Sequence, residues 1–226
     1  MIAVSCSNVT VGYDAVPVLR NVSFELPQGE SLLILGHNAS GKTTLLRTLF
    51  GLQRALEGRW CILGIDMPGG DPKGLVKKGV RYLGQGVRSF DEFTVGQSRS
   101  VLSRLYGLAP VRERSPSPRG RDRMRIKTMS LGQRRLEALT LLAAGRPQIF
   151  LLDEPTAGLD PRHVSEITGW IDDQMHGGIS FIIVEHDFRA LLNICQRAMV
   201  LRAGMVSFLG SSAKLRDDEL FASVFL

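Results

Sequence analysis

Residues 36–44 read GHNASGKTT and constrain the fold more than any other stretch of the chain. Four of these residues match the pattern G-x-x-x-x-G-K-[ST], namely Gly36, Gly41, Lys42 and Thr43. In this pattern backbone N–H groups surround a polyphosphate, the lysine neutralises it and the hydroxyl binds Mg²⁺. The apolar run before this loop, residues 31–35, has the length of a buried strand. The residues after the loop can form a helix whose positive end faces the phosphates. The pattern therefore predicts a nucleotide-binding strand, loop and helix.

The length and composition of the chain favour one compact domain, because 226 residues with 44% hydrophobic side chains can bury a core. No apolar run approaches the roughly 18 residues that cross a bilayer, and the first residues lack the layout of a signal peptide. The three cysteines show no C-x-x-C spacing, which argues against a disulfide framework or a zinc site. We therefore expect a cytosolic protein.

The net charge of +6 favours anionic partners, such as ATP, nucleic acid or anionic lipid, without choosing among them. Much of this charge lies in an arginine-rich segment, residues 112–127, which also contains prolines and no aromatic side chains. Prolines disfavour a helix there, and stacking on bases needs aromatic rings. We predict a solvated loop, with contact to a membrane surface or to nucleic acid as the alternative.

The spacing of apolar residues predicts strands alternating with helices. Strands are expected at residues 2–11, 18–26, 31–35, 59–65, 80–83, 149–152, 179–184, 198–201 and 205–209. Helices are expected at residues 42–50, from 94 onward in a small helical insert, at 134–144 after a start signal at Ser130, and at 161–175, 188–195 and 213–226. A turn is expected at 12–17 and a loop at 68–74. Such alternation implies a mainly parallel sheet, with the leading antiparallel strands as a flap beside it.

Two carboxylates follow the apolar strand expected at residues 149–152. The end of a strand is where an open α/β sheet binds its ligand. Asp153 can hold Mg²⁺ directly or through water, since a hard cation that bridges phosphates prefers oxygen ligands. Glu154 can then orient and polarise a water molecule for attack on the γ-phosphate. Carboxylates often cap strands for structural reasons, and the phosphate loop upstream is what favours the catalytic interpretation here.

The motifs taken together resemble the nucleotide-binding subunit of an ATP-binding-cassette (ABC) transporter. After the phosphate loop come, in the order of that family, Gln85, MSLGQRR at 129–135, LLDEP at 151–155, AGLD at 157–160 and EHD at 185–187. The resemblance covers essentially the whole chain. It implies an α/β fold of the P-loop NTPase class, with a mainly parallel core sheet, an antiparallel β flap and a small helical subdomain.

The resemblance also implies the domain layout and the roles of the residues that bind ATP. The chain would be a single domain, with the core and flap in residues 1–93 and 128–226 and the helical subdomain in about 94–127 together with the signature helix at 130–145. Tyr13 would stack on adenine. The phosphates would contact Gly36, His37, Asn38, Ala39, Ser40, Gly41, Lys42, Thr43 and Thr44.

Catalysis in this family requires a metal and three polar side chains around the γ-phosphate. Thr43, Gln85 and Asp153 match the Mg²⁺ shell, and Gln85 also matches the residue that senses the membrane partner. Glu154 matches the catalytic base. His186 matches the switch histidine that contacts the γ-phosphate.

The signature motif of the family would face ATP bound on another subunit, so that two such domains enclose two ATP molecules. The residues at this interface would be Ser130, Leu131, Gly132, Gln133 and Asp160. The chain departs from the family at Leu131, where the signature usually has a glycine, and at Ala39, where many phosphate loops have one. The second departure matters if residue 39 needs a positive φ angle. The hypothesis is an active ATPase whose rate these two residues could reduce.

The transported substrate is less constrained than the ATPase itself. Residues 85–95 resemble the Q-V-R-L-F-x-x-M-T-V stretch of ATPases that serve branched-chain amino-acid importers, and residues 184–187 and the short C-terminus resemble the same group, which includes urea importers. This predicts a subunit that powers import of branched-chain amino acids or related small polar amides. The runner-up is an exporter of drugs or glycoconjugates.

The expected partners follow from the same resemblance. They are ATP, transmembrane permease subunits, and a second copy or a sister ATPase, at the cytoplasmic side of the cell membrane as a peripheral protein. No nucleic-acid partner is expected, since soluble ABC proteins of that kind usually carry two cassettes or a long coiled coil. A soluble ABC ATPase acting on nucleic acid and a non-hydrolysing ATP-binding module remain alternatives.

Overall fold

The structure is a computed structural model that describes residues 1–14, 16–67, 71–85, 92–105, 121–145, 147–186 and 188–216. Several predictions from the sequence therefore lie outside the described residues. They concern most of the arginine-rich segment, most of the importer-like stretch after Gln85, Asp187 of the EHD motif, and the C-terminal segment beyond residue 216.

An antiparallel sheet forms the flap that the sequence predicts. It contains β1 (Ile2–Tyr13), β2 (Val16–Pro27), β4 (Ala55–Ile62) and β5 (Ile65–Asp66) in the order β2-β1-β4-β5. The predicted turn at residues 12–17 is too long, because β1 continues to Tyr13, which pairs with Val16. The strand predicted at 59–65 is two strands, since Leu63 and Gly64 both have positive φ and form a turn between them.

The second sheet is the mainly parallel core. Its strands are β3 (Ser31–Leu35), β6 (Val80–Leu83), β7 (Ile149–Asp153), β8 (Ser180–Val184), β9 (Arg197–Arg202) and β10 (Met205–Ser211). Their order is β10-β9-β3-β8-β7-β6, and all neighbours are parallel except β9 and β10. Because the flap and α1 cover one face of this sheet and helices cover the other, β3, β7 and β8 are buried at every residue, as their continuous apolar runs predict.

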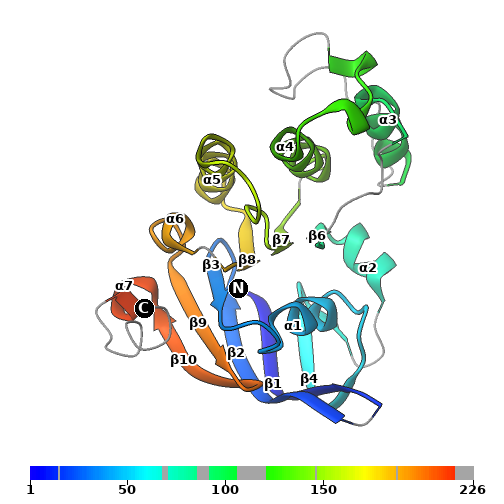
Figure 1. Ribbon diagram of the computed structural model, residues 1–226. Helices are drawn as coiled ribbons and strands as arrows, with labels where there is room; N and C mark the ends of the chain where they lie inside the picture. The colour runs from blue at the N-terminus through cyan, green and yellow to red at the C-terminus, as the bar shows by residue number, and fades with distance from the viewer. Residues whose placement is uncertain are drawn as a thin grey trace.

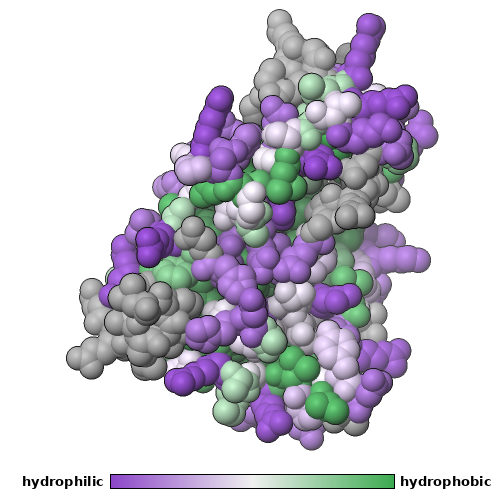
Figure 2. Space-filling model, viewed as in Figure 1, coloured by the Kyte–Doolittle hydropathy of each residue, from purple (hydrophilic) through white to green (hydrophobic). Residues whose placement is uncertain are grey.

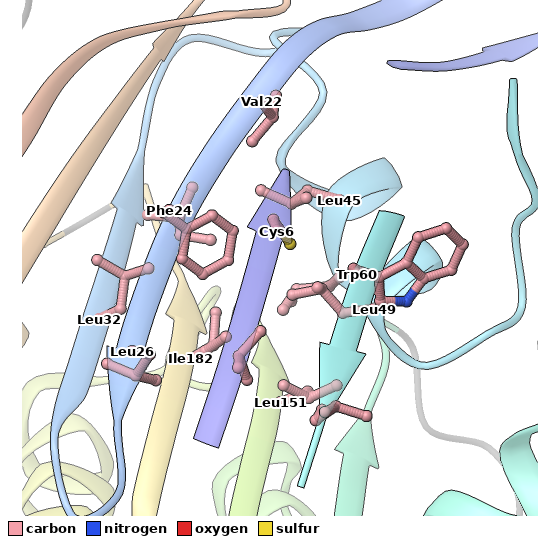
Figure 3. Packing of buried hydrophobic residues seen from close by; sticks show 14 of the residues in the cluster. Cys6, Val22, Phe24, Leu26, Leu32, Leu45, Leu49, Trp60, Leu151 and Ile182 are labelled. Carbon is pink, nitrogen blue, oxygen red and sulfur yellow. The ribbon is translucent and has the colours of Figure 1, made fainter. Parts of the chain in front are cut away.

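The core sheet separates two hydrophobic clusters. Alternate side chains of β3 enter different clusters, Leu32 and Ile34 toward the flap and Leu33 and Leu35 toward the opposite face. Figure 3 shows the first cluster, where Leu32, Leu151 and Ile182 of the core sheet lie close to side chains of β1, β2 and β4. The phosphate loop therefore follows a strand that is packed on both faces of the sheet.

The helices extend the two clusters. Helix α1 (Lys42–Leu49) contacts strands of both sheets and lies between them, whereas α5 (Pro161–His176) and α6 (Arg189–Leu192) pack on the other face (Figure 1). Helix α7 (Ser212–Arg216) packs on β9 and β10. The loop predicted at 68–74 is wrong from residue 72 onward, because Pro72 begins a short helix, α2 (Pro72–Lys77), as a proline at the first helical position can.

A helical region lies apart from the flap in Figure 1. It contains α3 (Val95–Leu105), 3₁₀ turns at Arg121–Arg123 and Ile126–Thr128, and α4 (Leu131–Leu142), and a small cluster of Val95, Ile126 and Met129 joins its parts. Ser130 begins α4 as predicted, through a capping box with Gln133. The helix ends at Leu142, two residues earlier than predicted. The proposed subdomain boundaries remain a prediction.

The end of α4 is tied to the core by the buried side chain of Arg81. Its guanidinium on β6 donates to the carbonyl oxygens of Leu142 at 3.0 Å and Ala144 at 3.2 Å, and also to that of Val76 at the end of α2 at 2.9 Å. Carbonyl groups at a helix C-terminus carry partial negative charge, so they offset the buried cation. The C-terminal end of α4 is therefore anchored to β6.

The viewed face of the molecule is largely hydrophilic, with hydrophobic side chains in small separate groups (Figure 2). Among the helices that the structure describes, none is long and apolar enough to cross a membrane.

Candidate nucleotide-binding site

Four parallel strands end at the same edge of the core sheet, and each is followed by a predicted site residue. The phosphate loop follows β3, Asp153 ends β7, His186 comes shortly after β8, and Gln85 comes shortly after β6. Because β3, β8, β7 and β6 are neighbours in that order, the fold brings together groups from four distant parts of the chain. This edge is where an α/β sheet binds its ligand.

The phosphate loop has a backbone that glycine makes possible. Gly36 has a φ of 151° and Gly41 a φ of 101°. A Cβ on Gly36 would overlap the carbonyl oxygen of Leu201, and one on Gly41 would overlap the side chain of Leu19. Both glycines are therefore required by space as well as by conformation.

Ala39 has a positive φ, the backbone conformation that would favour glycine at this position of the loop. Its φ is 62°, in the left-handed region, where an L-residue with a side chain is strained by about 1–2 kcal/mol. Ala39 is exposed together with His37 and Asn38, whereas Ser40 and Thr44 are buried. The loop therefore keeps the phosphate-binding conformation at some cost in backbone strain.

The Lys42 ammonium lies inside the phosphate loop. Its Nζ donates to the carbonyl oxygens of Gly36 at 2.7 Å and His37 at 2.9 Å, and the residue is 5% exposed. Burial lowers the pKa of Lys42, and the nearby carboxylates of Glu154 and Asp153 act in the opposite direction. A cation held over the centre of the loop is placed to neutralise phosphate oxygens.

Asp153 and Thr43 form a site that fits Mg²⁺ bound together with a nucleotide. Thr43 Oγ1 donates to Asp153 Oδ1 at 3.0 Å, while Asp153 Oδ2 is buried and has no hydrogen-bond partner in the described part of the chain. Burial raises the pKa of Asp153 to about 6, and the hydrogen bond from Thr43 and the charge of Lys42 offset only part of that rise. One carboxylate and one hydroxyl suit Mg²⁺, which takes its remaining ligands from phosphates and water.

Glu154 has a strained backbone and faces His186. Its φ is 52°, and its N–H donates to Val184 at 2.8 Å, which extends the pairing of β7 with β8 by one residue. Glu154 Oε1 lies 3.6 Å from His186 Nε2, and the two side chains are 19% and 43% exposed. Strained residues concentrate at functional sites, and the charge of this carboxylate acts on Lys42 and Asp153.

Glu185 holds the backbone of His186 and of Thr156 in place, a role that the sequence did not suggest. Its Oε1 accepts hydrogen bonds from the N–H and the hydroxyl of Thr156, both at 2.7 Å, and its Oε2 accepts from the N–H of His186 at 2.9 Å. Burial raises the pKa of Glu185, whereas these hydrogen bonds lower it. The contacts hold the start of the histidine loop against the segment after Glu154.

The signature residues lie at the N-terminus of α4, far from the phosphate loop in the sequence. The first of them, Ser130 and Leu131, are exposed. Ser130 Oγ accepts from the N–H of Gln133 at 3.2 Å, and the Gln133 side chain accepts from the N–H of Ser130 at 3.1 Å. Leu131 is 46% exposed, whereas Gly132 is buried. Arg135 of α4 donates to the carbonyl oxygen of Glu154 at 2.9 Å, which links this helix to the loop after β7.

The two remaining predicted residues lie at exposed positions. Tyr13 is 44% exposed at the end of β1, so its ring is free to stack on a planar ligand. Asp160 caps α5 by accepting from the N–H groups of Arg162 at 3.1 Å and His163 at 3.2 Å. Gln85 is also exposed, next to the end of β6.

The family model for ABC transporters matches residues 19–157, which is more than half of the chain. The chain belongs to the ABC transporter family. It is the ATP-binding subunit of such a transporter, and therefore an ATPase, as the sequence analysis predicts.

Relatives of this ABC subunit match it over nearly its whole length. The lipopolysaccharide export system ATP-binding protein LptB of Haemophilus influenzae is 29% identical over 235 residues, covering 100% of this chain and 98% of its own. The branched-chain amino acid transport ATP-binding protein BraG of Pseudomonas aeruginosa is 28% identical over 229 residues, covering 98% of each chain. The two relatives serve different substrates, so similarity alone does not choose a cargo.

The fold of this ABC subunit matches that of a solved ATP-binding cassette. A nucleotide-free cassette from an ABC transporter superposes with a TM-score of 0.85 at 23% identity, covering 100% of this chain and 99% of the other. Identity this low supports the fold alone. The predicted ABC ATPase fold, with its parallel core and antiparallel flap, is confirmed.

Three contacts of this ABC subunit were missed by the sequence analysis. They involve Arg135, Thr156 and Glu185, each of which lies within or directly beside a recognised motif. Their positions in the motifs were the available signal. Which backbone group each would hold depends on the packing of α4 and β8 against the loop after β7, and the sequence does not give that packing.

Proposed function

We propose that this subunit hydrolyses ATP, with Glu154 as the catalytic base, to drive a membrane transporter. The observation that carries the proposal is the placement of the Glu154 carboxylate and His186 beside the phosphate loop, with the Thr43 and Asp153 oxygens next to them. A base at this place can take a proton from a water molecule that attacks the γ-phosphate. His186, next to Glu154, would contact the γ-phosphate.

The other groups would bind and orient the nucleotide. Lys42, the loop residues from Gly36 to Thr44 and the positive end of α1 would hold the phosphates, and Tyr13 would stack on adenine. Thr43, Gln85 and Asp153 would hold Mg²⁺, which neutralises the charge on the phosphates when it is bound. Glu185 would position His186 through its backbone N–H.

We infer that a second ATPase subunit completes the site. The exposed N-terminal turn of α4, with Ser130, Leu131, Gly132 and Gln133, would contact ATP bound on that subunit, and Asp160 would lie at the same interface. A helix N-terminus with free N–H groups favours an anion. The partner would be a second copy or a sister ATPase, docked with permease subunits at the cytoplasmic side of the membrane.

The test of the hydrolytic role is Glu154→Gln, compared with Glu166→Gln on the surface of α5 as the control. A general base contributes about 10² to 10⁴-fold, so we expect steady-state hydrolysis to fall by that factor while binding of a fluorescent ATP analogue is retained. The control should hydrolyse ATP at the rate of the unchanged protein. Full activity in Glu154→Gln would remove Glu154 from this role.

We propose import of branched-chain amino acids or related small amides as the transport function. The resemblance of residues 85–95 to importer ATPases and the similarity to BraG support it. Export of a glycolipid is the second candidate, and the equally strong similarity to LptB favours it. Cells that lack this chain should lose uptake of radiolabelled leucine, and the unchanged gene, but not Glu154→Gln, should restore it. Unaltered leucine uptake together with a defective cell envelope would favour export.

A further inference from the structure

The imidazole of His163 connects two surface elements that the sequence analysis treated separately. His163 is the third residue of α5, three positions after the cap residue Asp160. Its Nδ1 lies 2.5 Å from Asp160 Oδ2, while Asp160 Oδ1 accepts the N–H groups of Arg162 and His163. Both oxygens of the Asp160 carboxylate are therefore held in place, and the hydrogen bond from His163 is the main cause that lowers the pKa of Asp160.

The same ring packs against the signature turn. A Cβ built on Gly132 would overlap the Cγ and Cδ2 atoms of His163. The His163 side chain is only 18% exposed, compared with 56% for Asp160, since Gly132 covers its other face. The ring thus contacts the second residue of α4 on one side and the carboxylate that caps α5 on the other.

We propose that His163 is a positioning residue that joins the signature turn and Asp160 into one rigid unit. This rests on the proposed function, in which both elements contact the second subunit. When α4 shifts, the ring carries the Asp160 carboxylate with it, so both groups reach the other subunit's ATP in a constant mutual geometry. His163 itself touches no nucleotide.

The geometry also explains why this chain has one glycine in its signature where relatives of the family have two. Position 132 must be glycine because the His163 ring occupies the space of a Cβ. Position 131 is exposed at the first residue of α4, so a leucine fits there without a clash inside the chain. Glycine is less favourable than alanine inside a helix, and at position 132 the ring leaves no room for alanine.

The test compares three replacements of His163 in the full chain. His163→Asn keeps a donor for Asp160 and loses the ring, His163→Phe keeps a ring against Gly132 and loses the donor, and His163→Ala loses both. Arg162→Ala is the control, since its side chain is 85% exposed and pairs with Glu166 in the next turn. The readouts are kcat at saturating ATP over a range of protein concentrations, and binding of a fluorescent ATP analogue at a dilution where the chain is monomeric.

We expect His163→Ala to lower kcat about tenfold, the loss of roughly one hydrogen bond and its packing. The protein concentration at half-maximal rate should rise, while the affinity of the monomer for the ATP analogue stays within twofold. His163→Asn and His163→Phe should each recover part of the rate, and Arg162→Ala should match the unchanged protein. An unchanged kcat in His163→Ala, or an equal loss of kcat and monomer affinity, would overturn the proposal.

A second measurement does not depend on hydrolysis and so separates this proposal from the proposed function. Gly132→Ala should destabilise the chain in thermal unfolding because the new methyl group overlaps the His163 ring. In the His163→Ala background the same substitution should leave the unfolding temperature unchanged or raise it. Equal destabilisation in both backgrounds would refute the contact itself, whereas inactivity of the unchanged protein would refute only the ATPase assignment.

Discussion

The phosphate loop and the signature turn are alike in sequence, but a side chain in place of glycine strains the backbone in the first and not in the second. Each contains glycine, each leads into a helix, and each has a non-glycine residue where the family usually has glycine. Ala39 in the phosphate loop has a φ of 62° and is strained within the chain. Leu131 in the signature turn has helical backbone and a 46% exposed side chain, so it meets no obstacle in its own subunit.

The difference shows where each departure would be felt. Strain at Ala39 exists in every copy of the chain, whether or not ATP or a partner is present. The bulk of Leu131 would matter only when a second subunit approaches the signature turn. We therefore expect Ala39 to affect the stability of the subunit and Leu131 to affect assembly and turnover.

The supports of the two regions differ in the same way. Helix α1 after the phosphate loop is packed between both sheets, with six of its residues buried. Helix α4 is anchored at its C-terminal end by Arg81, while its N-terminal turn is held by a capping box and by His163. The phosphate loop is therefore built into the core, and the signature turn is a surface presented by one end of a helix.

The largest expected effect is on the phosphate-loop side. Gly36→Ala would place a methyl group against the carbonyl oxygen of Leu201 at a φ of 151°, so we expect the free energy of unfolding to fall by about 3 to 5 kcal/mol. Urea denaturation measures this. Gly169→Ala in α5 is the control, because its new methyl group meets no atom within 4 Å, and it should stabilise the chain by up to about 1 kcal/mol. Tolerance of Gly36→Ala would erase the contrast between the two loops.

The next effect is a pH dependence of opposite sign at the two regions. The pKa of Asp153 is raised to about 6, so its contribution to stability is present below its unfolded value near 4 and lost as the pH rises through 6, by about 3 kcal/mol. The pKa of Asp160 is lowered, so its contribution is present above its unfolded value and is lost as the pH falls.

Urea denaturation from pH 3 to pH 8 in EDTA, without nucleotide, tests these signs. The stability of the unchanged protein relative to Asp153→Asn should decrease as the pH rises. The stability relative to Asp160→Asn should increase over the acidic part of the range. A flat difference for Asp153→Asn would show that burial does not raise the pKa of this carboxyl group.

A smaller effect is expected at the signature turn. Leu131→Gly should raise the ATPase rate of the assembled pair by up to about tenfold, the value of one added hydrogen bond to phosphate, and lower the free energy of unfolding by no more than about 1 kcal/mol. Steady-state hydrolysis at high protein concentration measures the first and urea denaturation the second. A lower rate would mean that Leu131 contacts the partner favourably.

The smallest effect is expected at Ala39. Ala39→Gly removes about 1–2 kcal/mol of backbone strain from the folded state. Glycine also makes the unfolded chain more flexible, which lowers the free energy of unfolding by about 0.5–1 kcal/mol. We therefore expect a net gain of up to about 1 kcal/mol in the free energy of unfolding. Thermal unfolding with and without ATP measures it. A loss of stability on this substitution would place the strain elsewhere in the loop.

Much of the fold was predictable because its elements have local signals. The buried strands before the phosphate loop and before Asp153 are continuous apolar runs, and the helix at residues 161–176 begins at a capping aspartate followed by proline. The errors occur where the pattern of apolar residues is short or absent. Helix α2 has only six residues, and the strand predicted at 59–65 is divided by Leu63, a residue type that rarely adopts a positive φ.

The order of the motifs, the chemistry of their side chains and the family of this ABC subunit all follow from the amino-acid sequence. Spacing along the chain is enough for that, because loop, strand and helix signals are local. The folded structure was needed to show that Ala39 is strained, that Glu185 holds the loop of His186 and that His163 fills the space beside Gly132. These depend on contacts between β7, β8, α4 and α5, which are distant in sequence and meet only when the sheet and its helices pack.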